Sequence, residues 1–178
     1  MKNMQIVFVP SRSLNGVSRK VDDAEFGEEL ENHMKNMLTK MYELNGAGLA
    51  GIQVGDSRRI LVADGGTGPI MMVNPEIVER SEETASLREG CLSLPDFRLD
   101  VERNSLIKVE YNSPLGEEQE KEFSGIESVI VQHEMDHLDG ITLLQKISRL
   151  KRDMYIRKIN KLKRKIKRRI EQSNQVYY

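Results

Sequence analysis

Apolar residues recur at three- and four-residue steps in three stretches of the chain, which is the spacing of one face of an α-helix. The first stretch predicts a helix over residues 25–44. The second predicts a helix that follows Ser124-Gly125 and ends at Gly140. The third predicts a helix over residues 149–170, in which a thin apolar stripe is set among many lysines and arginines. The pattern therefore predicts an N-terminal, a central and a C-terminal helix.

Shorter apolar or alternating runs between these stretches predict β-strands. We expect strands at residues 5–9, 59–63, 70–73, 76–81, 106–111 and 118–123. Asn74-Pro75 is expected to end the strand at 70–73. Residues 89–95 are rich in turn-forming types and are expected to form a turn. Helices together with hairpin-linked strands predict an α+β fold with antiparallel strands around the central helix.

Composition narrows the class of protein. The 178 residues fit one domain, and the net charge is −1. A single cysteine excludes an intrachain disulfide and hence a disulfide-stapled secreted fold. No apolar run approaches the roughly 20 residues needed to span a bilayer, and the N-terminus lacks the apolar core and cleavage site of a signal peptide. We expect a cytoplasmic protein with no membrane partner.

The near-zero net charge conceals a strong asymmetry along the chain. Residues 146–178 hold 13 lysines and arginines against 2 acidic residues, a net charge of +11. Residues 1–145 hold 14 basic and 26 acidic residues, a net charge of −12. A basic tail on an acidic body favours a polyanionic partner such as nucleic acid. The alternative is a solvated helix that packs on the acidic body.

The strongest chemical signal is the sequence His133-Glu134-Met135-Asp136-His137. Residues four apart lie on one face of a helix, so both imidazoles can bind one metal ion. Glu134 lies about 100° around the helix from His133. At that angle it can reach a water molecule held by the ion and act as a general base. The alternative is a chance pair of surface histidines.

Catalytic metal sites commonly have three protein ligands and one open position, so a third ligand is needed. The candidate is Cys91, the only cysteine, which lies in a turn-rich segment. A free cysteine is often only a small buried apolar residue, but this one is not on an apolar stripe. A thiolate ligand favours a softer transition metal over Mg²⁺ or Ca²⁺.

Three charged residues near these candidates have two interpretations each. Glu89 either pairs with Arg103 and braces the Cys91 segment, or the two form a solvated surface pair. Asp136 is a potential hydrogen-bond partner for a ligand histidine, although an exposed position on the helix is the favoured interpretation.

Taken together, residues 46–53, 89–93 and 132–140 resemble the three motifs of the peptide deformylase family, in the same order and at similar spacing. One difference is Gly51, where the family usually has a second alanine. The resemblance covers nearly the whole chain. It implies an α+β fold in which antiparallel strands surround a central metal-binding helix, with residues 1–148 as the catalytic domain. The basic helix and tail at 149–178 are expected to belong to the same domain.

The resemblance also implies an activity, which is removal of the N-formyl group from the formyl-methionine of nascent polypeptides, with release of formate. Glu134 would transfer the proton. The Gln53 side-chain amide and the Leu92 backbone N–H would stabilise the oxyanion, and Gly48 would hydrogen-bond the substrate backbone. The implied ligands of the metal, usually Fe²⁺ and often replaced by Zn²⁺ or Ni²⁺, are Cys91, His133 and His137.

Specificity for such a small acyl group must come from the methionine side chain. Ile126, Val129 and Ile130 precede the histidines by one or two helical turns, and with Leu87 they would line an apolar slot. The alternative for each of the four is a plain core residue.

Two other functions remain open at this level. A metallopeptidase shares the His-Glu-x-x-His pattern, but the third histidine of the extended metzincin pattern is absent. The other alternative is a nucleic-acid-binding protein without catalysis, which the complete set of metal and base residues disfavours. We expect a monomeric deformylase that binds formyl-methionyl nascent peptides and, through its basic C-terminal helix, the RNA of the ribosome.

Overall fold

The computed structural model describes residues 4–174, with residues 167–174 as backbone only. The chain divides into two compact units, the first ending at Thr142 and the second beginning at Leu143. Residues 175–178, the end of the expected basic tail, lie outside the described residues.

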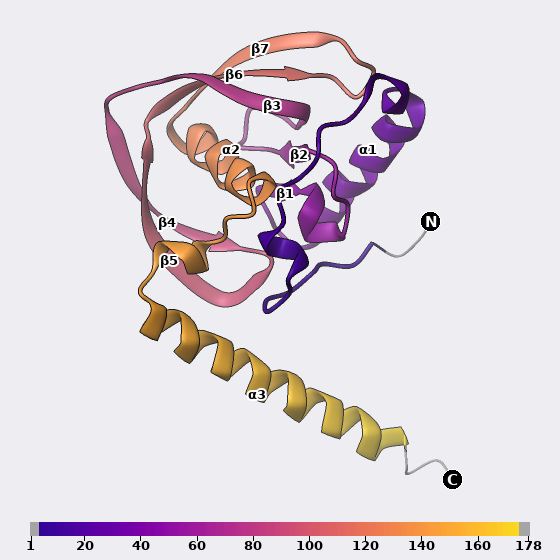
Figure 1. Cartoon of the computed structure of the whole chain (residues 1–178), viewed down its shortest axis with the longest axis vertical. Coiled ribbons are helices and arrows are strands. Elements are labelled where there is room, and N and C mark those ends of the chain that lie inside the picture. Colours follow the sequence, from indigo (N-terminus) through magenta and orange to yellow (C-terminus); the bar gives the residue numbers. More distant parts are fainter. Residues whose placement is uncertain (1–3, 175–178) are drawn as a thin grey trace. The chain divides into compact units, whose positions relative to one another are not determined.

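The first unit contains two long helices and seven strands (Figure 1). The predicted mixture of helices and antiparallel strands is confirmed. The second unit contains a short 3₁₀ turn and α3, Arg149–Asn174, so all three predicted helices are present. The elements of the first unit are α1 Glu28–Glu43, β1 Gly48–Ala50, β2 Ile60–Ala63, β3 Ile70–Arg80, β4 Thr84–Cys91, β5 Leu94–Asn104, β6 Leu106–Asn112, β7 Glu118–Ser124 and α2 Gly125–Leu138.

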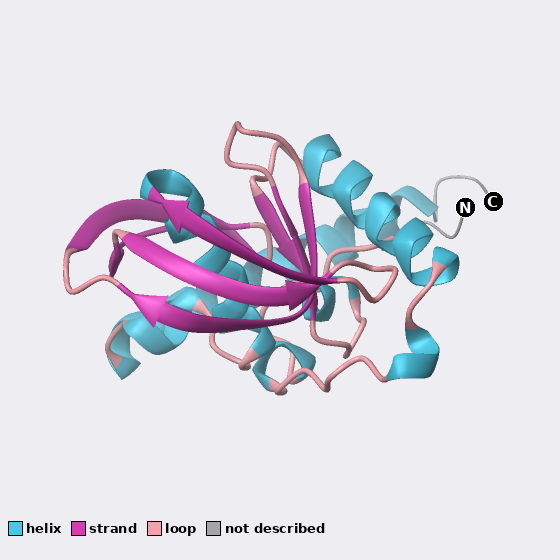
Figure 2. Cartoon of the chain, turned by 90° about the horizontal axis from the view of Figure 1, so that it is seen from above, coloured by secondary structure: helices cyan, strands magenta, loops and turns pink. Residues whose placement is uncertain are grey.

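The strands form two antiparallel sheets. Five strands pair in the order β1-β2-β3-β6-β7, while β4 and β5 form a separate two-stranded hairpin. The longer strands are visibly curved in Figure 2, as expected from the right-handed twist of β-sheets. Helix α2 packs against β1, β2, β6 and β7 of the larger sheet and against β5 of the hairpin. It therefore contacts both sheets.

The core lies where helices cover the larger sheet. Both α1 and α2 contact β2, and all four residues of β2 are buried. Since successive strand residues point to opposite faces, both faces of the sheet are covered at this strand. The α1 side is filled by flexible sulfur-containing and branched side chains, which are Leu30, Met34, Met37, Met41, Leu49, Ile60, Val62 and Val73.

Two strand predictions are wrong. Residues 5–9 belong to neither sheet. Asn74-Pro75 does not end a strand, because β3 continues through both residues to Arg80 with a register shift between Val73 and Glu76. A bulge tolerates proline because its missing N–H is not needed for pairing. The Asn74 side chain supports the bulge with two hydrogen bonds to the backbone of Val21.

The prediction of a turn at residues 89–95 is also wrong in most of its length. Residues up to Cys91 belong to β4, residues from Leu94 belong to β5, and only Leu92-Ser93 turn between them. The sequence carries little sign of the strand β4, because residues 84–88 are all exposed and mostly polar or small and so lack an alternating apolar pattern. The consequence is a long hairpin that ends next to the cysteine.

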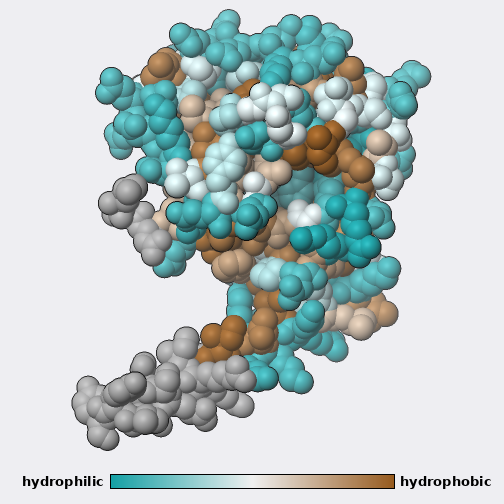
Figure 3. Space-filling model, turned by 180° about the vertical axis from the view of Figure 1, so that it is seen from behind, coloured by the Kyte–Doolittle hydropathy of each residue, from teal (hydrophilic) through white to brown (hydrophobic). Residues whose placement is uncertain are grey.

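The exposed surface is mixed in character. Hydrophilic side chains dominate the face shown in Figure 3, and apolar side chains form small areas between them. Among residues 4–174, no helix combines the length and the apolar content required to cross a membrane.

We predict that Gly140→Ala destabilises the protein more than Gly55→Ala. Both glycines have positive φ, +74° and +83°, so each alanine suffers about 1–2 kcal/mol of left-handed strain. A Cβ at Gly140 would also lie 2.7 Å from the carbonyl oxygen of Asn15. A Cβ at Gly55 would have no neighbouring atom within 4 Å. The overlap adds about 1–3 kcal/mol. Urea unfolding of both variants measures the difference, and equal losses would contradict the packing argument.

Candidate metal centre

The structure brings together the three side chains expected to bind a metal. His133 and His137 lie one turn apart on α2, with their ring centroids 5.1 Å apart. Cys91 is the last residue of β4. One ligand atom from each of the three lies within 4.8 Å of the other two. We call these three side chains the metal cluster. No other group of three such residues was found in the described part of the chain.

Each histidine is held differently. His133 Nδ1 lies 2.7 Å from a carboxylate oxygen of Glu89, which leaves Nε2 for an ion. His137 Nε2 lies 3.2 Å from Cys91 Sγ. His137 Nδ1 is buried and has no hydrogen-bond partner among the described residues. A carboxylate behind a ligand histidine is the usual arrangement in metal sites, because it sets the tautomer and the orientation of the ring.

Glu134 lies beside this cluster in a space that Gly48 leaves open. Its side chain is buried, and Oε2 has no hydrogen-bond partner within residues 4–174. A Cβ on Gly48 would overlap the Glu134 carboxylate, so the glycine is required for the present position of Glu134. Burial raises the pKa of Glu134 to about 7. A carboxyl group with that pKa can take up and return a proton near neutral pH.

Gln53 has a fixed side-chain orientation. It comes from the 3₁₀ turn η3, Gly51–Val54, and is 1% exposed. Its amide oxygen accepts a hydrogen bond of 2.8 Å from the N–H of Ala50. Its amide nitrogen donates to Ser93 Oγ at 3.3 Å and reaches Cys91 Sγ at 3.6 Å. The amide N–H groups therefore face the metal cluster. Sequence reasoning missed Ser93.

A buried ion network fixes the hairpin to α2. The Arg103 guanidinium, on β5, donates two hydrogen bonds to Glu89 at 2.7 and 2.9 Å and one to Asp136 at 2.6 Å. Arg103 and Glu89 are both 5% exposed at the side chain. The brace between them is therefore present, and the solvated surface pair is wrong. The expectation that Asp136 is exposed is also wrong, because Arg103 holds it.

The pKa values in this cluster follow from burial and from these contacts. Burial raises the pKa of Glu89, but hydrogen bonds from Arg103 and His133 outweigh it and lower that pKa to about 2. Burial lowers the pKa of His133, but its hydrogen bonds with Cys91 and Glu89 outweigh burial and raise it. Burial, followed by the charge of His133, lowers the pKa of His137 well below the usual value. A metal ion binds only the deprotonated forms of these side chains, so the affinity of this group for a metal ion should rise with pH.

Period-two alternation would have placed Glu89 on the same face as Cys91. Glu89 and Cys91 are two residues apart on β4, so their side chains share one face of the strand. That inference requires a strand at 84–91, and the turn-forming residue types at 89–95 do not indicate one.

A cavity of about 660 Å³ opens onto Cys91, His133 and Glu134. All four residues expected to line the methionine slot lie on its wall, as do Gly48 and Leu92. Val129 is buried, while Leu87 and Ile126 are 37% and 54% exposed and lie at the open rim. Lining residues that sequence reasoning missed include Phe8, Leu44, Pro95 and Arg98.

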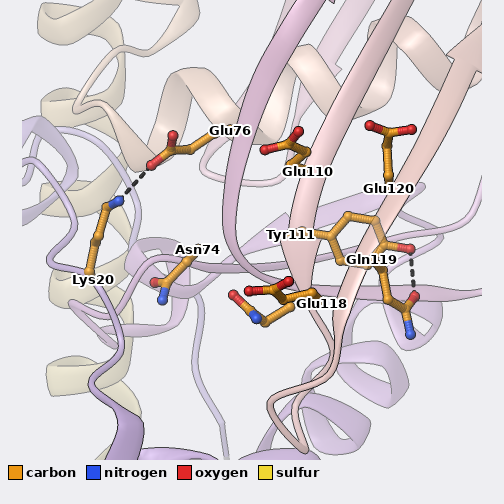
Figure 4. Close-up of a pocket in the computed structure, with 9 residues that line it drawn as sticks. Lys20, Asn74, Glu76, Glu110, Tyr111, Glu118, Gln119 and Glu120 are labelled. Carbon is orange, nitrogen blue, oxygen red and sulfur yellow. Dashed lines mark hydrogen bonds and ion pairs between the residues drawn. The ribbon is translucent and has the colours of Figure 1, made fainter.

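A second cavity, of about 520 Å³, lies on the outer part of the larger sheet (Figure 4). Glu76, Glu110 and Glu120 are cross-strand neighbours on β3, β6 and β7. Lys20 forms an ion pair with Glu76 at one wall. Its lining contains neither cysteine nor histidine, so this cavity has no counterpart of the metal cluster.

Comparisons with known proteins agree on one family. Residues 3–153 match the family model described as polypeptide deformylase. The peptide deformylase of Thermotoga maritima is 41% identical over 144 residues, covering 81% of this chain and 88% of its own. Peptide deformylase 1 of Rickettsia conorii is 39% identical over 176 residues, covering 93% and 99%. The crystal structure of peptide deformylase from Ehrlichia chaffeensis superposes with a TM-score of 0.85 at 33% identity, covering 91% and 97%.

We predict that Arg103→Ala costs about 3–5 kcal/mol of stability, because it leaves two carboxylates near the site without their cation. Arg19→Ala is the control, since Arg19 forms an ion pair with Glu25 but is half exposed, and it should change stability little. Thermal and urea unfolding measure both.

The same network gives stability a defined pH dependence. The folded-state pKa of Glu89 is below its ordinary value of 4.5, so its contribution is complete above about pH 4.5 and is lost as the pH falls toward 2. Arg103→Ala should flatten the stability profile in this interval. If the variant loses the same stability as the wild type between about pH 4.5 and 2, the network does not cause that loss.

Proposed function

The chain belongs to the polypeptide deformylase family and hydrolyses the N-formyl group of formyl-methionyl peptides, and from this premise we propose how its residues perform the reaction. Cys91, His133 and His137 hold a divalent transition metal, Fe²⁺ in the cell, with Zn²⁺ or Ni²⁺ as substitutes. The donor set fits, because one thiolate and two imidazoles suit these ions and three ligands leave a position open. The central helix α2 is then the metal-binding helix.

The observation that carries this proposal is the meeting of the three ligand atoms within 4.8 Å beside a buried, unpartnered Glu134 oxygen. When bound, the metal ion supplies Lewis acidity, which lowers the pKa of a water molecule and polarises the formyl carbonyl. Glu134 accepts the proton of the attacking water at its carboxylate. It then delivers that proton to the substrate nitrogen as the bond between carbon and nitrogen breaks, which gives formate and a free amine.

Gln53 and Leu92 stabilise the negative charge that develops on the formyl oxygen. The Gln53 amide nitrogen already faces the cluster, because Ala50 and Ser93 hold both ends of the amide. The backbone N–H of Leu92 follows Cys91 directly in the turn between β4 and β5. Loss of one such donor typically lowers kcat by about 10²–10³-fold. Gly48 hydrogen-bonds the substrate backbone and leaves space for Glu134.

The cavity beside the metal cluster selects the methionine side chain. A formyl group has no side chain of its own, so the enzyme must recognise the residue that carries it. Val129 and Ile130 provide apolar wall, and Leu87 and Ile126 narrow the open rim. An unbranched methionine side chain fits an apolar slot of this kind without leaving a polar group unpaired.

Family membership favours this reaction over both alternatives. A metallopeptidase with a His-Glu-x-x-His motif would not need the cysteine that lies 3.2 Å from His137. A binding protein without catalysis would not need the buried proton acceptor next to it. The substrates of the family are formyl-methionyl nascent peptides.

We further propose that the enzyme works as a cytoplasmic monomer on the ribosome. Residues 1–148 form its catalytic domain, and residues 149–178 form a basic helix and tail of the same domain. Between residues 149 and 166, α3 carries nine lysines and arginines and one aspartate, which favours contact with RNA phosphates.

We predict that Glu134→Gln keeps the metal but lowers formate release from formyl-Met-Ala by about 10²–10⁴-fold, because it removes the general base. The iron form is kept anaerobic, and metal content is measured for both proteins. An unformylated Met-Ala peptide is the control for peptidase activity. Near-normal turnover by the metal-replete variant would reject the assigned role, and cleavage of the control peptide would indicate a peptidase.

We predict that deletion of the residues after about Leu150 spares hydrolysis of short formyl peptides but abolishes co-sedimentation with ribosomes at low salt. Binding of the full chain should weaken steeply as salt rises, because each neutralised phosphate releases counterions. The variant Lys161→Glu/Arg164→Glu is a milder test that keeps the helix. Unchanged co-sedimentation of the truncated protein would refute docking through α3, and loss of peptide activity would show that α3 is required for the fold.

A further inference from the structure

The N-terminal segment crosses two of the segments that build the site. Residues 5–9 are in neither sheet, yet Val9 is 4% exposed. Met4 and Ile6 pack against the core cluster of α1 and the larger sheet, which anchors the beginning of the segment (indigo in Figure 1). We call Val7-Phe8-Val9 the N-terminal strap.

The strap makes one backbone hydrogen bond to each of two distant segments. The N–H of Val7 donates to the carbonyl oxygen of Gln53 at 2.8 Å. The N–H of Val9 donates to the carbonyl oxygen of Ser93 at 3.1 Å. Gln53 is in η3 and Ser93 is in the turn after Cys91. The strap therefore connects η3 to this turn through two of its own N–H groups, which lie two residues apart.

The same two segments are also joined through their side chains. The Gln53 amide nitrogen donates to Ser93 Oγ at 3.3 Å and lies 3.6 Å from Cys91 Sγ. The backbone bonds of the strap and this side-chain bond close one ring of contacts. A shift of η3 relative to the turn would break at least one of them, and buried polar groups left unpaired are costly. The ring thus fixes the distance between the Gln53 amide and the Cys91 end of β4.

The strap also reaches the cavity itself. Phe8, whose side chain alternates with those of Val7 and Val9, lines the cavity wall and is 43% exposed. The strap therefore lies at the site and is part of its boundary.

We infer that the N-terminal strap is a positioning element for the Gln53 amide in the hydrolysis of formyl peptides. This inference rests on the proposed function, in which Gln53 stabilises the oxyanion. Such donors must lie within hydrogen-bond distance of the developing charge, and small displacements from that geometry cost large factors in rate. Without the bond from Val7, the strap no longer ties η3 to the turn, and the hydrogen bonds that remain between them are those of the Gln53 amide to Ser93 and Cys91.

Val7→Pro removes the donor to Gln53 and tests the inference. The matched control is Gln5→Pro, in the same segment. Among residues 4–174, the N–H of Gln5 donates no backbone hydrogen bond outside the helices and strands. We expect Val7→Pro to lower kcat for formyl-Met-Ala about tenfold, with KM and metal content close to those of Gln5→Pro. A kcat equal to that of the control would overturn the inference.

A double-mutant cycle separates positioning from general damage. If the strap acts through Gln53, Val7→Pro has little further effect on kcat once Gln53 is replaced by alanine. If the two effects multiply, the strap does not act through Gln53 and the inference is wrong. A wild-type protein that releases no formate would instead reject the proposed function.

Amide hydrogen exchange on the unmodified protein tests the strap without any variant or activity. The amides of Val7 and Val9 should be protected, and that of Gln5 should exchange much faster. Exchange of Val7 and Val9 as fast as Gln5 would overturn the inference, whatever the kinetics of the variants.

Discussion

A single buried guanidinium, that of Arg103, lies between carboxylates that belong to two other elements. It is carried by β5, and it binds Glu89 of β4 and Asp136 of α2. These charges are satisfied together only when the hairpin and the helix meet in one arrangement, because a buried charge without its partner is strongly unfavourable. Cys91 is two residues after Glu89, and the two histidines flank Asp136 on α2. The arrangement that satisfies Arg103 therefore also brings the cysteine to the histidines.

Two glutamates near the cluster acquire opposite properties from their surroundings. Glu89 accepts hydrogen bonds from Arg103 and contacts His133, and its pKa falls to about 2. Glu134 is buried with one oxygen unpartnered, and its pKa rises to about 7. A permanently ionised carboxylate suits the orientation of an imidazole, whereas a carboxylate that titrates near neutrality suits proton transfer. The division of roles arises from burial and hydrogen bonding, since the two side chains are chemically identical.

The site draws on four parts of the chain that are far apart in sequence. These are the N-terminal strap, η3, the junction of β4 with β5, and α2. None of them could hold its functional group alone, because each depends on hydrogen bonds or packing from another. The Gln53 amide, for example, is oriented by Ala50 within η3 and by Ser93 from the hairpin. The cavity is likewise bounded by Phe8 from one end of the chain and by Ile126 from α2.

Local periodicity was enough to predict the helices, and it placed His133 and His137 on one face with Glu134 beside them. Those inferences need only the 3.6-residue repeat, which any helix obeys. Cys91 followed from the number of ligands that a catalytic metal requires, and Gln53, Leu92 and Gly48 from the resemblance of the motifs. The course of β3 through Asn74-Pro75 was not predictable in this way, because a bulge supported by Val21 makes it possible.

The partner of His133, the ion pair of Asp136 with Arg103 and the place of Phe8 at the cavity were also decided by tertiary structure. Each depends on a contact between residues more than 25 positions apart, and a single sequence carries no periodic signal for such a contact. The sequence by itself thus determined which chemical groups the protein has and which lie on a common helix face. Only the folded chain decided which of them are buried and paired, because burial and pairing depend on neighbours that the fold brings together.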